Sequence, residues 1–436
     1  MNKKRIEVVE YIEDNEGKII DFLKDYVSFK SINTGKEGEG IEKEVQDWLA
    51  DSLNSFGFKV DKWAEDKKNP RPNVVATYEG EGTGRDLILN GHSDVVPEIQ
   101  DWSRDPWDPE VIDGKVYGRG TSDMKGPNTA AIWALKALKD VGIGLDGNVF
   151  LQLVAGEESN EGDTIGTNSA VERGYRAPFA VVMEPTNLEI HVKSSSLFFF
   201  KIIIPGKSVH NSSRNQVIFP QPFGVKSGHD VGVDALQKTL PFINLFYRLE
   251  RDWNQRWSDP VLGGGGYTSH DQQGTGVFTI NPALIVGGGY LGAVPGEVEV
   301  TYGVWYPPDV DKQTLWDEIK TKVRSLASTD DWLKDHPPEV KVPVLQEWEG
   351  FETELDEPGI EVLQKSFNEV TEKNTPISGF KAVCDATYLG TNDIPAVVCG
   401  PGSIAYGVHG SDEFIPVREL VEAAKVYATF ILNWCS

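Results

Sequence analysis

The chain has 436 residues, a formal net charge of -25 at pH 7 and a hydrophobic content of 39%. This length is typical of two domains, and the composition is typical of a globular protein with a buried core. The strong negative charge argues against binding to nucleic acid or anionic membranes by bulk attraction, so we expect neither as a partner.

The N-terminal segment lacks the features of a signal peptide. Its first residues are basic, but residues 6–16 carry four Glu and one Asp where an apolar core would be needed. No apolar run in the sequence approaches the roughly 20 residues of a membrane span. The three cysteines are too few, and odd in number, for a disulfide framework. We therefore expect a cytoplasmic protein.

The first part of the chain alternates between predicted helices and strands. The elements expected there are two helices within residues 1–56, strands at 59–63, 73–78 and 86–90, a glycine-rich loop at 114–120, a helix at about 126–140, and strands at 149–154 and 179–183. This alternation predicts a layered α/β domain with a largely parallel core sheet.

The pattern changes between about residues 195 and 307, where polar and glycine-rich loops become frequent. The elements expected here are a strand at 197–204, a helix at 233–253, and strands at 277–286 and 297–305. An α+β insertion of this size is most simply a second domain, with Pro307-Pro308 as a return hinge. The first pattern then resumes with helices at 312–327, 358–371 and 417–433 and a strand at 396–399. The expected domains are 1–194 with 308–436, and 195–307.

His92 and Asp94 follow the apolar strand expected at 86–90. Because strand side chains alternate between faces, both point to the same side. A histidine oriented by a carboxylate is typical of a zinc ligand, although a histidine at a strand end can also be purely structural.

Other carboxylates and a second histidine occupy comparable places. Asp123 precedes a helix, where it is either an N-cap or a ligand. Glu157 and Glu158 follow a buried strand, and because adjacent side chains diverge, one could bind a metal while the other moves a proton. Glu184 follows another strand, and His409 lies in a glycine-rich segment. Ligands of open α/β sheets bind beyond the strands' carboxyl ends, so these residues suit two divalent ions, zinc first, with manganese or cobalt as substitutes.

The order of these motifs resembles the acetylornithine deacetylase and succinyl-diaminopimelate desuccinylase family of dinuclear zinc amidohydrolases and peptidases. The matching motifs are Gly91-His92-x-Asp94, Gly118-Arg119-Gly120-x-x-Asp123-Met124-Lys125-Gly126, Glu157-Glu158, Glu184-Pro185-Thr186 and the late His409. The resemblance implies a three-layer α/β zinc-hydrolase catalytic domain, interrupted by a smaller α+β lid domain that commonly dimerises. We therefore expect a homodimer formed through the lid.

The resemblance also implies a set of metal ligands. His92 and Glu184 would hold one ion, Glu158 and His409 the other, and Asp123 would bridge them. It further implies a cis peptide bond after Asp123.

Three further residues receive catalytic roles from the resemblance. Asp94 would orient His92, and Glu157 would take a proton from a metal-bound water and pass it to the leaving nitrogen. His210 of the lid would help to bind the oxyanion, whereas a histidine in a polar loop is otherwise simply solvated.

Three substrate-binding positions depart from the family pattern. The family's Asn-x-x-Pro, Asp-x-Arg and Ser-Asp-x-Arg-Phe correspond here to Gly292-Ala293-Val294-Pro295, Gly303-Val304-Trp305 and Cys384-Asp385-Ala386-Thr387-Tyr388. Both arginines that would bind a substrate carboxylate are therefore absent. Either Arg214, Lys207 or Lys193 supplies the charge, or the substrate lacks that carboxylate.

In the second case, which we favour, Trp305 and Tyr388 present aromatic surfaces to a more neutral or ring-bearing acyl amide. The expected function is metal-dependent hydrolysis of an amide bond, by which an acyl group is removed from a small-molecule amine. A dipeptidase or carboxypeptidase of the same superfamily is an alternative, although peptidase relatives often carry Asp where this chain has Glu184. An inactive hydrolase-fold binding protein is a further alternative, which the retention of every ligand and of Glu157 argues against.

Overall fold

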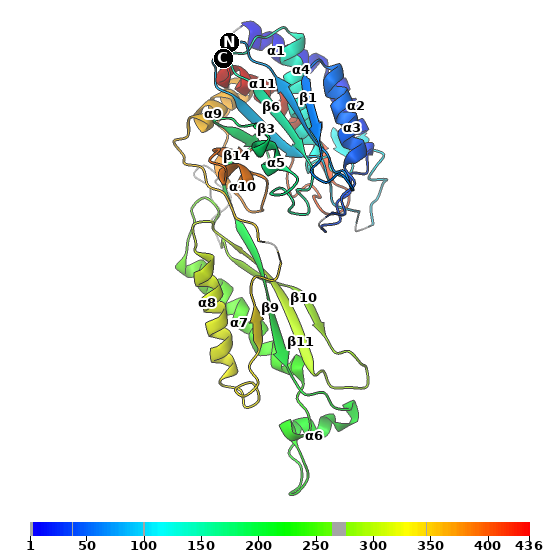
Figure 1. Ribbon diagram of the computed structural model, residues 1–436, viewed down its shortest axis with the longest axis vertical. Coiled ribbons are helices and arrows are strands. Elements are labelled where there is room, and N and C mark those ends of the chain that lie inside the picture. The colour runs from blue at the N-terminus through cyan, green and yellow to red at the C-terminus, as the bar shows by residue number, and fades with distance from the viewer. Residues whose placement is uncertain (1–2, 37, 99–100, 264–275, 346) are drawn as a thin grey trace. The chain divides into compact units, whose positions relative to one another are not determined.

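The computed structural model describes residues 3–36, 38–98, 101–263, 276–345 and 347–436. The chain forms two compact units (Figure 1). The first comprises residues 1–194 and 351–436, and the second contains most of residues 195–350. Within the described residues, no helix combines the length and the apolar character needed to cross a membrane.

The first unit is built on an eight-stranded sheet with the order β1-β2-β6-β3-β7-β14-β8-β13. Its strands are β1 (Lys59–Trp63), β2 (Asn73–Tyr78), β3 (Leu87–His92), β6 (Val149–Val154), β7 (Ala180–Val182), β8 (Ile190–Ser194), β13 (Ile377–Phe380) and β14 (Ala396–Val398). The central strands β6, β3, β7 and β14 are parallel, as the alternation of elements predicted. The pairs β1–β2, β2–β6 and β14–β8 are antiparallel.

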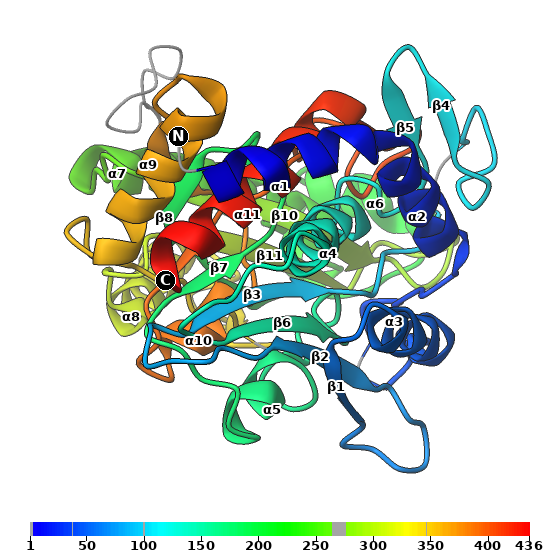
Figure 2. The ribbon, with the colours of Figure 1, turned by 90° about the horizontal axis from the view of Figure 1, so that it is seen from above.

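Helices cover both faces of this sheet. They are α1 (Lys3–Asp14), α2 (Glu16–Ser28), α3 (Lys43–Ser55), α4 (Lys125–Asp140), α5 (Thr167–Glu172), α9 (Pro358–Thr371), α10 (Ala386–Gly390) and α11 (Val417–Trp434). Figure 2 shows α1, α4 and α11 on one side of β3 and β6, with α5 and α10 on the other. A small sheet of β4 (Glu110–Ile112), β5 (Lys115–Tyr117) and β15 (Phe414–Pro416) completes the unit. The three-layer α/β expectation is confirmed.

The second unit is a four-stranded antiparallel sheet in the order β10-β11-β9-β12, packed against two long helices. Its elements are β9 (Ser196–Pro205), the 3-10 turns η1 (Asn211–Ser213) and η2 (Gly228–Asp230), α6 (Arg214–Ile218), α7 (Ala235–Arg256), β10 (Thr279–Gly287), β11 (Glu297–Tyr306), α8 (Lys312–Ala327) and β12 (Glu339–Lys341). Alternate residues of β9 and β11 enter one core, where the rings of Phe200, Phe246 and Tyr302 are in contact. The expected α+β character is confirmed.

The second unit extends beyond the boundary expected at residue 307. Leu315, Ile319 and Val323 of α8 are buried in the same core as β9 and β11. The helix expected at 312–327 is therefore correct in its position, but its apolar face stabilises the inserted unit rather than the first one.

The N-terminal region differs from the two helices expected. Three helices form because the polar residues around Asn15 interrupt the first of them. The side chain of Asn15 donates to the carbonyl of Tyr11 at 2.7 Å, and this local bond ends α1 before α2 begins.

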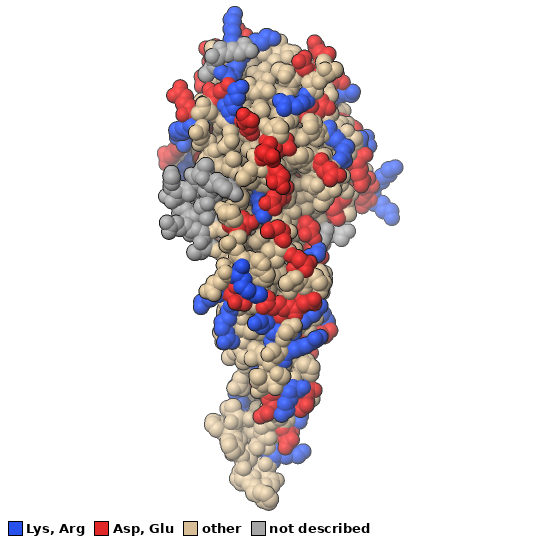
Figure 3. Space-filling view, turned by 90° about the vertical axis from the view of Figure 1, so that its left-hand side faces the viewer, with Lys and Arg blue, Asp and Glu red and all other residues tan. Residues whose placement is uncertain are grey.

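Surface charge is mixed over much of the second unit. Figure 3 shows Lys and Arg interspersed with Asp and Glu, and few charges at the end near α6. Large apolar side chains exposed in this region are Ile218, Phe219, Phe223 and Val225. Exposed apolar side chains gathered in one region are typical of an association surface.

Candidate metal centre

Sheet register brings the predicted ligands to one edge of the first unit. In the parallel pairs, His92 of β3 lies opposite Val154 of β6, and Asn90 lies opposite Val182 of β7. The segments after these strands carry Asp94, Glu157 with Glu158, and Glu184. Parallel strands end on the same side of a sheet, so these side chains converge although their strands are far apart in the sequence.

Five side chains form two groups that share one member. His92 Nε2 lies 3.1 Å from Asp123 Oδ1 and 3.7 Å from Glu184 Oε1. His409 Nε2 lies 3.1 Å from Glu158 Oε2 and 3.4 Å from Asp123 Oδ2. In each group, the potential ligand atoms all lie within 4.8 Å of one another. Asp123 therefore directs one oxygen to each histidine, as a bridging ligand would.

The residues present fit a pair of divalent ions. Glu158 Oε1 is buried and has no hydrogen-bond partner among the described residues. A buried carboxylate oxygen without a partner is costly, and a cation would satisfy it. Two imidazoles and three carboxylates are also a donor set that zinc and similar ions accept.

The pKa values reflect the crowding of acids around the two histidines. Burial opposes the charged form of His92, yet Asp123, Glu184 and Glu157 raise its pKa well above the ordinary value. Hydrogen bonds to Asp123 and Glu158 raise the pKa of His409 to about 11. Burial, together with neighbouring acids, raises the pKa of Glu157 and Glu184 well above the usual range. The excess of carboxyl groups in this cluster therefore favours the binding of cations.

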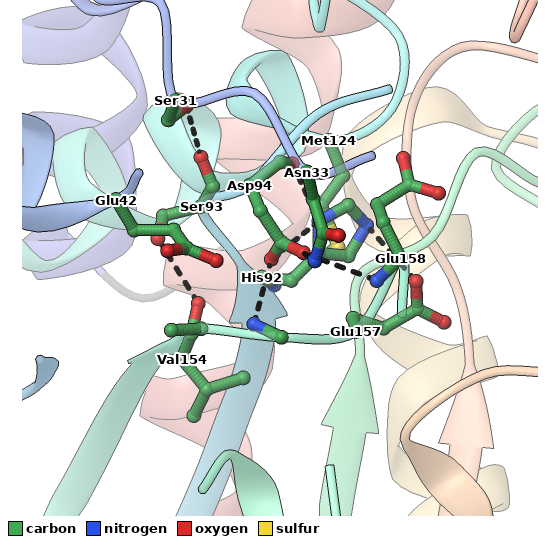
Figure 4. A network of polar contacts seen from close by, with 12 residues as sticks. Ser31, Asn33, Glu42, His92, Ser93, Asp94, Met124, Val154, Glu157 and Glu158 are labelled. Carbon is green, nitrogen blue, oxygen red and sulfur yellow. Dashed lines mark hydrogen bonds and ion pairs between the residues drawn. The ribbon is translucent and has the colours of Figure 1, made fainter. Parts of the chain in front are cut away.

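Asp94 has two roles rather than the single one expected. His92 Nδ1 is 2.9 Å from the main-chain oxygen of Asp94 and 3.6 Å from its Oδ1. The carboxylate of Asp94 accepts hydrogen bonds from the N–H groups of Gly156 (3.2 Å) and Glu158 (3.1 Å) and from Asn33 Nδ2 (2.9 Å) (Figure 4). Asp94 therefore contacts His92 mainly through its backbone, while its side chain anchors the turn with Glu157 and Glu158.

Asn33 is a supporting residue that the sequence motifs did not reveal. It is fully buried, and its Nδ2 also donates to Ser159 Oγ at 2.8 Å. One side chain from the N-terminal segment thus contacts both Asp94 and the turn after β6. No local pattern marks Asn33, because its partners lie 61 and 126 residues away.

Glu413 is a second supporting residue. Its fully buried carboxylate accepts hydrogen bonds of 2.8–3.0 Å from the main-chain N–H groups of Gly120, Ser122 and Asp123. Arg119 Nη1 donates to the same carboxylate at 2.6 Å, and Arg119 Nη2 donates to the carbonyl of Gly410 at 2.7 Å. These contacts join the loop with Asp123 to the loop with His409.

Two backbone features lie at the same place. The peptide bond between Asp123 and Met124 is cis, as the resemblance implied. His409 has a φ of 58°, a left-handed conformation that is uncommon for residues other than glycine. The left-handed conformation of His409 is of a kind that persists where surrounding contacts hold it, and such residues are frequent at functional sites.

The other candidate residues lie outside these two groups. His210 and Trp305 belong to the second unit. His210 is exposed, with Nδ1 2.8 Å from Ser212 Oγ, whereas Trp305 is half-buried on β11. Tyr388 belongs to the first unit and donates its hydroxyl to Asn160 Oδ1 at 2.6 Å. Their roles in binding substrate stay predictions.

The three cations considered as replacements for the missing arginines all have partners in their own unit. Arg214 pairs with Asp234, the residue that caps α7. Lys193 Nζ lies 3.1 Å from Glu352, and Lys207 donates to two main-chain carbonyls. Each of these cations therefore has a partner within the described residues.

Several known proteins are similar to this chain over most of its length. The model of peptidase family M20/M25/M40 matches residues 88–433. The N-formyl-4-amino-5-aminomethyl-2-methylpyrimidine deformylase of Bacillus subtilis (strain 168) is 30% identical, over 98% of this chain and 96% of its own. The acetylornithine deacetylase of Proteus mirabilis (strain HI4320) is 24% identical, over 95% of this chain and 96% of its own.

The solved structure of the dipeptidase Dug1p from Saccharomyces cerevisiae has the same fold. It has a TM-score of 0.72 at 14% identity and covers 100% of this chain and 99% of its own. The chain belongs to peptidase family M20/M25/M40 and is a metal-dependent hydrolase that cleaves the amide bond of acylated amines.

Proposed function

We propose that this protein removes a short acyl group from an amine attached to a ring-bearing group. Two divalent ions, with zinc as the preferred metal, would be held at the centre described above. The observation that carries the proposal is the pair of ligand groups that share Asp123. His92 and Glu184 would complete one ion site, and Glu158 and His409 would complete the other.

Two features support a ring-bearing amine without a carboxylate. The relative that is 30% identical over nearly the whole chain is named for a formylated aminopyrimidine. The positions at which the family carries carboxylate-binding arginines hold Trp305 and Thr387 here. A carboxylate placed near them would lack the bidentate partner that arginine provides.

Two divalent ions bound at the centre would polarise the scissile carbonyl and make a water molecule more acidic. Glu157 belongs to neither ligand group, yet its Oε2 lies 3.9 Å from His92 Nε2. A carboxylate placed beside a metal ligand without being one itself can accept a proton from the attacking water. Glu157 would take a proton from the attacking water and deliver it to the leaving nitrogen as the C–N bond breaks.

We also propose that the second unit is a lid through which two copies associate. Strand β10 is an edge strand of its sheet, and Leu284, Ile285 and Val286 on it are more than half exposed. An apolar edge strand is suited to pairing with its symmetry-related copy. The participation of His210 in binding the oxyanion and a cytoplasmic location stay predictions.

The test is a substrate screen on metal-depleted and metal-restored protein. We expect about two ions per chain by mass spectrometry and hydrolysis of N-formyl and N-acetyl benzylamines that a chelator abolishes. Faster cleavage of dipeptides would favour the peptidase alternative. Absence of both metal binding and hydrolysis would favour an inactive hydrolase-fold binding protein.

A further inference from the structure

Glu161 is a buried carboxylate three residues after Glu158, and the proposed mechanism does not use it. Its residue is only 5% exposed. Its main-chain N–H donates to the carbonyl of Gly156 at 2.8 Å, and this hydrogen bond closes the turn that contains Glu157 and Glu158. A displacement of Glu161 would therefore be passed directly to the turn that carries the proposed proton acceptor and a proposed metal ligand.

The side chain of Glu161 accepts hydrogen bonds from three groups. Its Oε1 accepts one from the main-chain N–H of Gly38 at 3.0 Å. Its Oε2 accepts hydrogen bonds from Arg71 Nη1 and from Ser159 Oγ. Gly38 and Arg71 lie 123 and 90 residues before Glu161 in the sequence. The carboxylate therefore connects the turn to two other segments of the first unit.

Arg71 is itself fixed by a second buried glutamate. Its Nε and Nη2 donate to the two carboxylate oxygens of Glu42 at 2.8 and 2.6 Å, and both residues are buried. Two such hydrogen bonds orient a planar guanidinium more precisely than a single contact does. A Cβ built on Gly40 would lie 2.4 Å from Arg71 Nη2, so glycine at this position lets the backbone approach the guanidinium closely.

The pairing of β2 with β6 explains why Arg71 reaches the turn. The two strands are antiparallel, so the residues before β2 run beside the residues after β6. Asn73 Oδ1 accepts a hydrogen bond from the N–H of Ala155 at 3.0 Å. The segment that leads into β2 thus holds the turn at its start through Asn73, and at its end through Arg71 and Glu161.

We propose that Glu161 is a positioning residue, which through its contact with Arg71 keeps Glu157 and Glu158 in place for proton transfer and metal binding. The inference rests on the proposed function and adds the group that fixes the geometry of the turn. Glu161 belongs to neither ligand group, so its effect is passed on through the turn. Because Glu158 belongs to only one of the two ligand groups, a displaced turn weakens the binding of one ion more than that of the other.

The test uses two variants and a matched control. Glu161→Gln removes the charge from the contact with Arg71, whereas Arg71→Lys keeps the charge and loses the planar fork. The control is Glu369→Gln on α9, which removes the same charge from the ion pair with Arg5 in the same unit. Chemical denaturation shows whether each protein is folded, and Arg71→Lys tests the proposal if Glu161→Gln does not fold.

Release of zinc from the zinc-loaded proteins to a competing chelator is the first measurement. We expect both Glu161→Gln and Arg71→Lys to bind one of the two ions about 10- to 100-fold more weakly, the range for groups that hold a ligand in place. The control should bind both ions as the wild-type protein does. If both ions were weakened equally in Glu161→Gln and neither in Arg71→Lys, Glu161 would act by its charge alone and the proposal would be wrong.

Steady-state kinetics with N-formylbenzylamine at saturating zinc is the second measurement. A displacement of about 1 Å can cost about 10²-fold in rate, so we expect kcat of Glu161→Gln to fall by about 10- to 100-fold with KM nearly unchanged. Glu369→Gln should keep the wild-type kcat. If Glu161→Gln lowered the denaturation midpoint but kept the wild-type kcat and zinc affinity, Glu161 would be purely structural and the proposal would be wrong.

The zinc measurement separates this inference from the proposed function. If no formamide were cleaved but Glu161→Gln and Arg71→Lys each released one ion more readily, the proposed function would fail and the positioning role would stand. If the wild-type protein cleaved formamides and both variants kept its zinc affinity and kcat, the positioning role would fail.

Discussion

The two units hold their candidate functional residues in different ways. In the first unit, His92, Asp123, Glu158 and Glu184 are largely buried and lie at the ends of neighbouring elements. Asp94 accepts a hydrogen bond from the loop that carries Glu158, and Glu413 accepts one from the loop that carries Asp123. In the second unit, His210 is exposed on a polar segment. The rigid sheet edge is suited to metal-dependent chemistry, whereas exposed segments are suited to changes in substrate range.

The largest effect is expected in the first unit from Glu157→Gln. The glutamine cannot accept the proton, so we expect kcat to fall by about 10²- to 10⁴-fold. Glu157 belongs to neither ligand group, so both ions should remain. Turnover and metal content by mass spectrometry check both statements. Normal turnover would show that Glu157 does not take the proton from the water, and loss of an ion would show that Glu157 is a metal ligand.

Glu413→Gln tests whether the buried contacts behind the ligands matter. The change leaves Arg119 buried with a neutral partner, so we expect a loss of about 3–5 kcal/mol in the free energy of unfolding. The loops with Asp123 and His409 would also be held less firmly, and we expect metal affinity to fall by about 10- to 100-fold.

Chemical denaturation and metal titration measure these two effects of Glu413→Gln. Asp47→Asn is the control, because Asp47 forms exposed ion pairs with Lys43 and Lys62 and should cost no more than about 1 kcal/mol. If metal affinity were unchanged in folded Glu413→Gln protein, Glu413 would stabilise the fold without positioning the ligands.

His210→Ala tests whether chemistry is confined to the first unit. If His210 helps to bind the oxyanion, we expect kcat to fall by about 10- to 100-fold, with metal content and stability unchanged. His210 is exposed, so its removal should not disturb packing. An unchanged kcat would show that His210 takes no part in catalysis and that the candidate catalytic residues all belong to the first unit.

The smallest effect on turnover is expected from Ile285→Lys in the edge strand β10. A charged side chain at this edge opposes pairing with a second copy, so the protein should become monomeric in light scattering. Val111→Lys, on an exposed strand of the first unit, is the matched control and should not change the mass. A wild-type protein that is already monomeric would contradict the proposed dimer.

Much of the fold follows from patterns that are local in the sequence. The strands that end near His92, Glu157 and Glu184 are predicted from apolar runs, and their parallel arrangement follows from the alternation with helices. Motif order then indicates the five ligands. The boundary at residue 307 was wrong because an amphipathic helix such as α8 does not specify which core its apolar face joins.

Residue type and short-range spacing predicted most of the elements, and the resemblance of the motifs to a known family indicated the ligand set and the loss of the arginines. Only the tertiary structure decided how the centre is supported. Asn33 meets Asp94 across 61 residues, and Glu413 meets Asp123 across 290. Such hydrogen bonds depend on positions that are set by the packing of the whole unit.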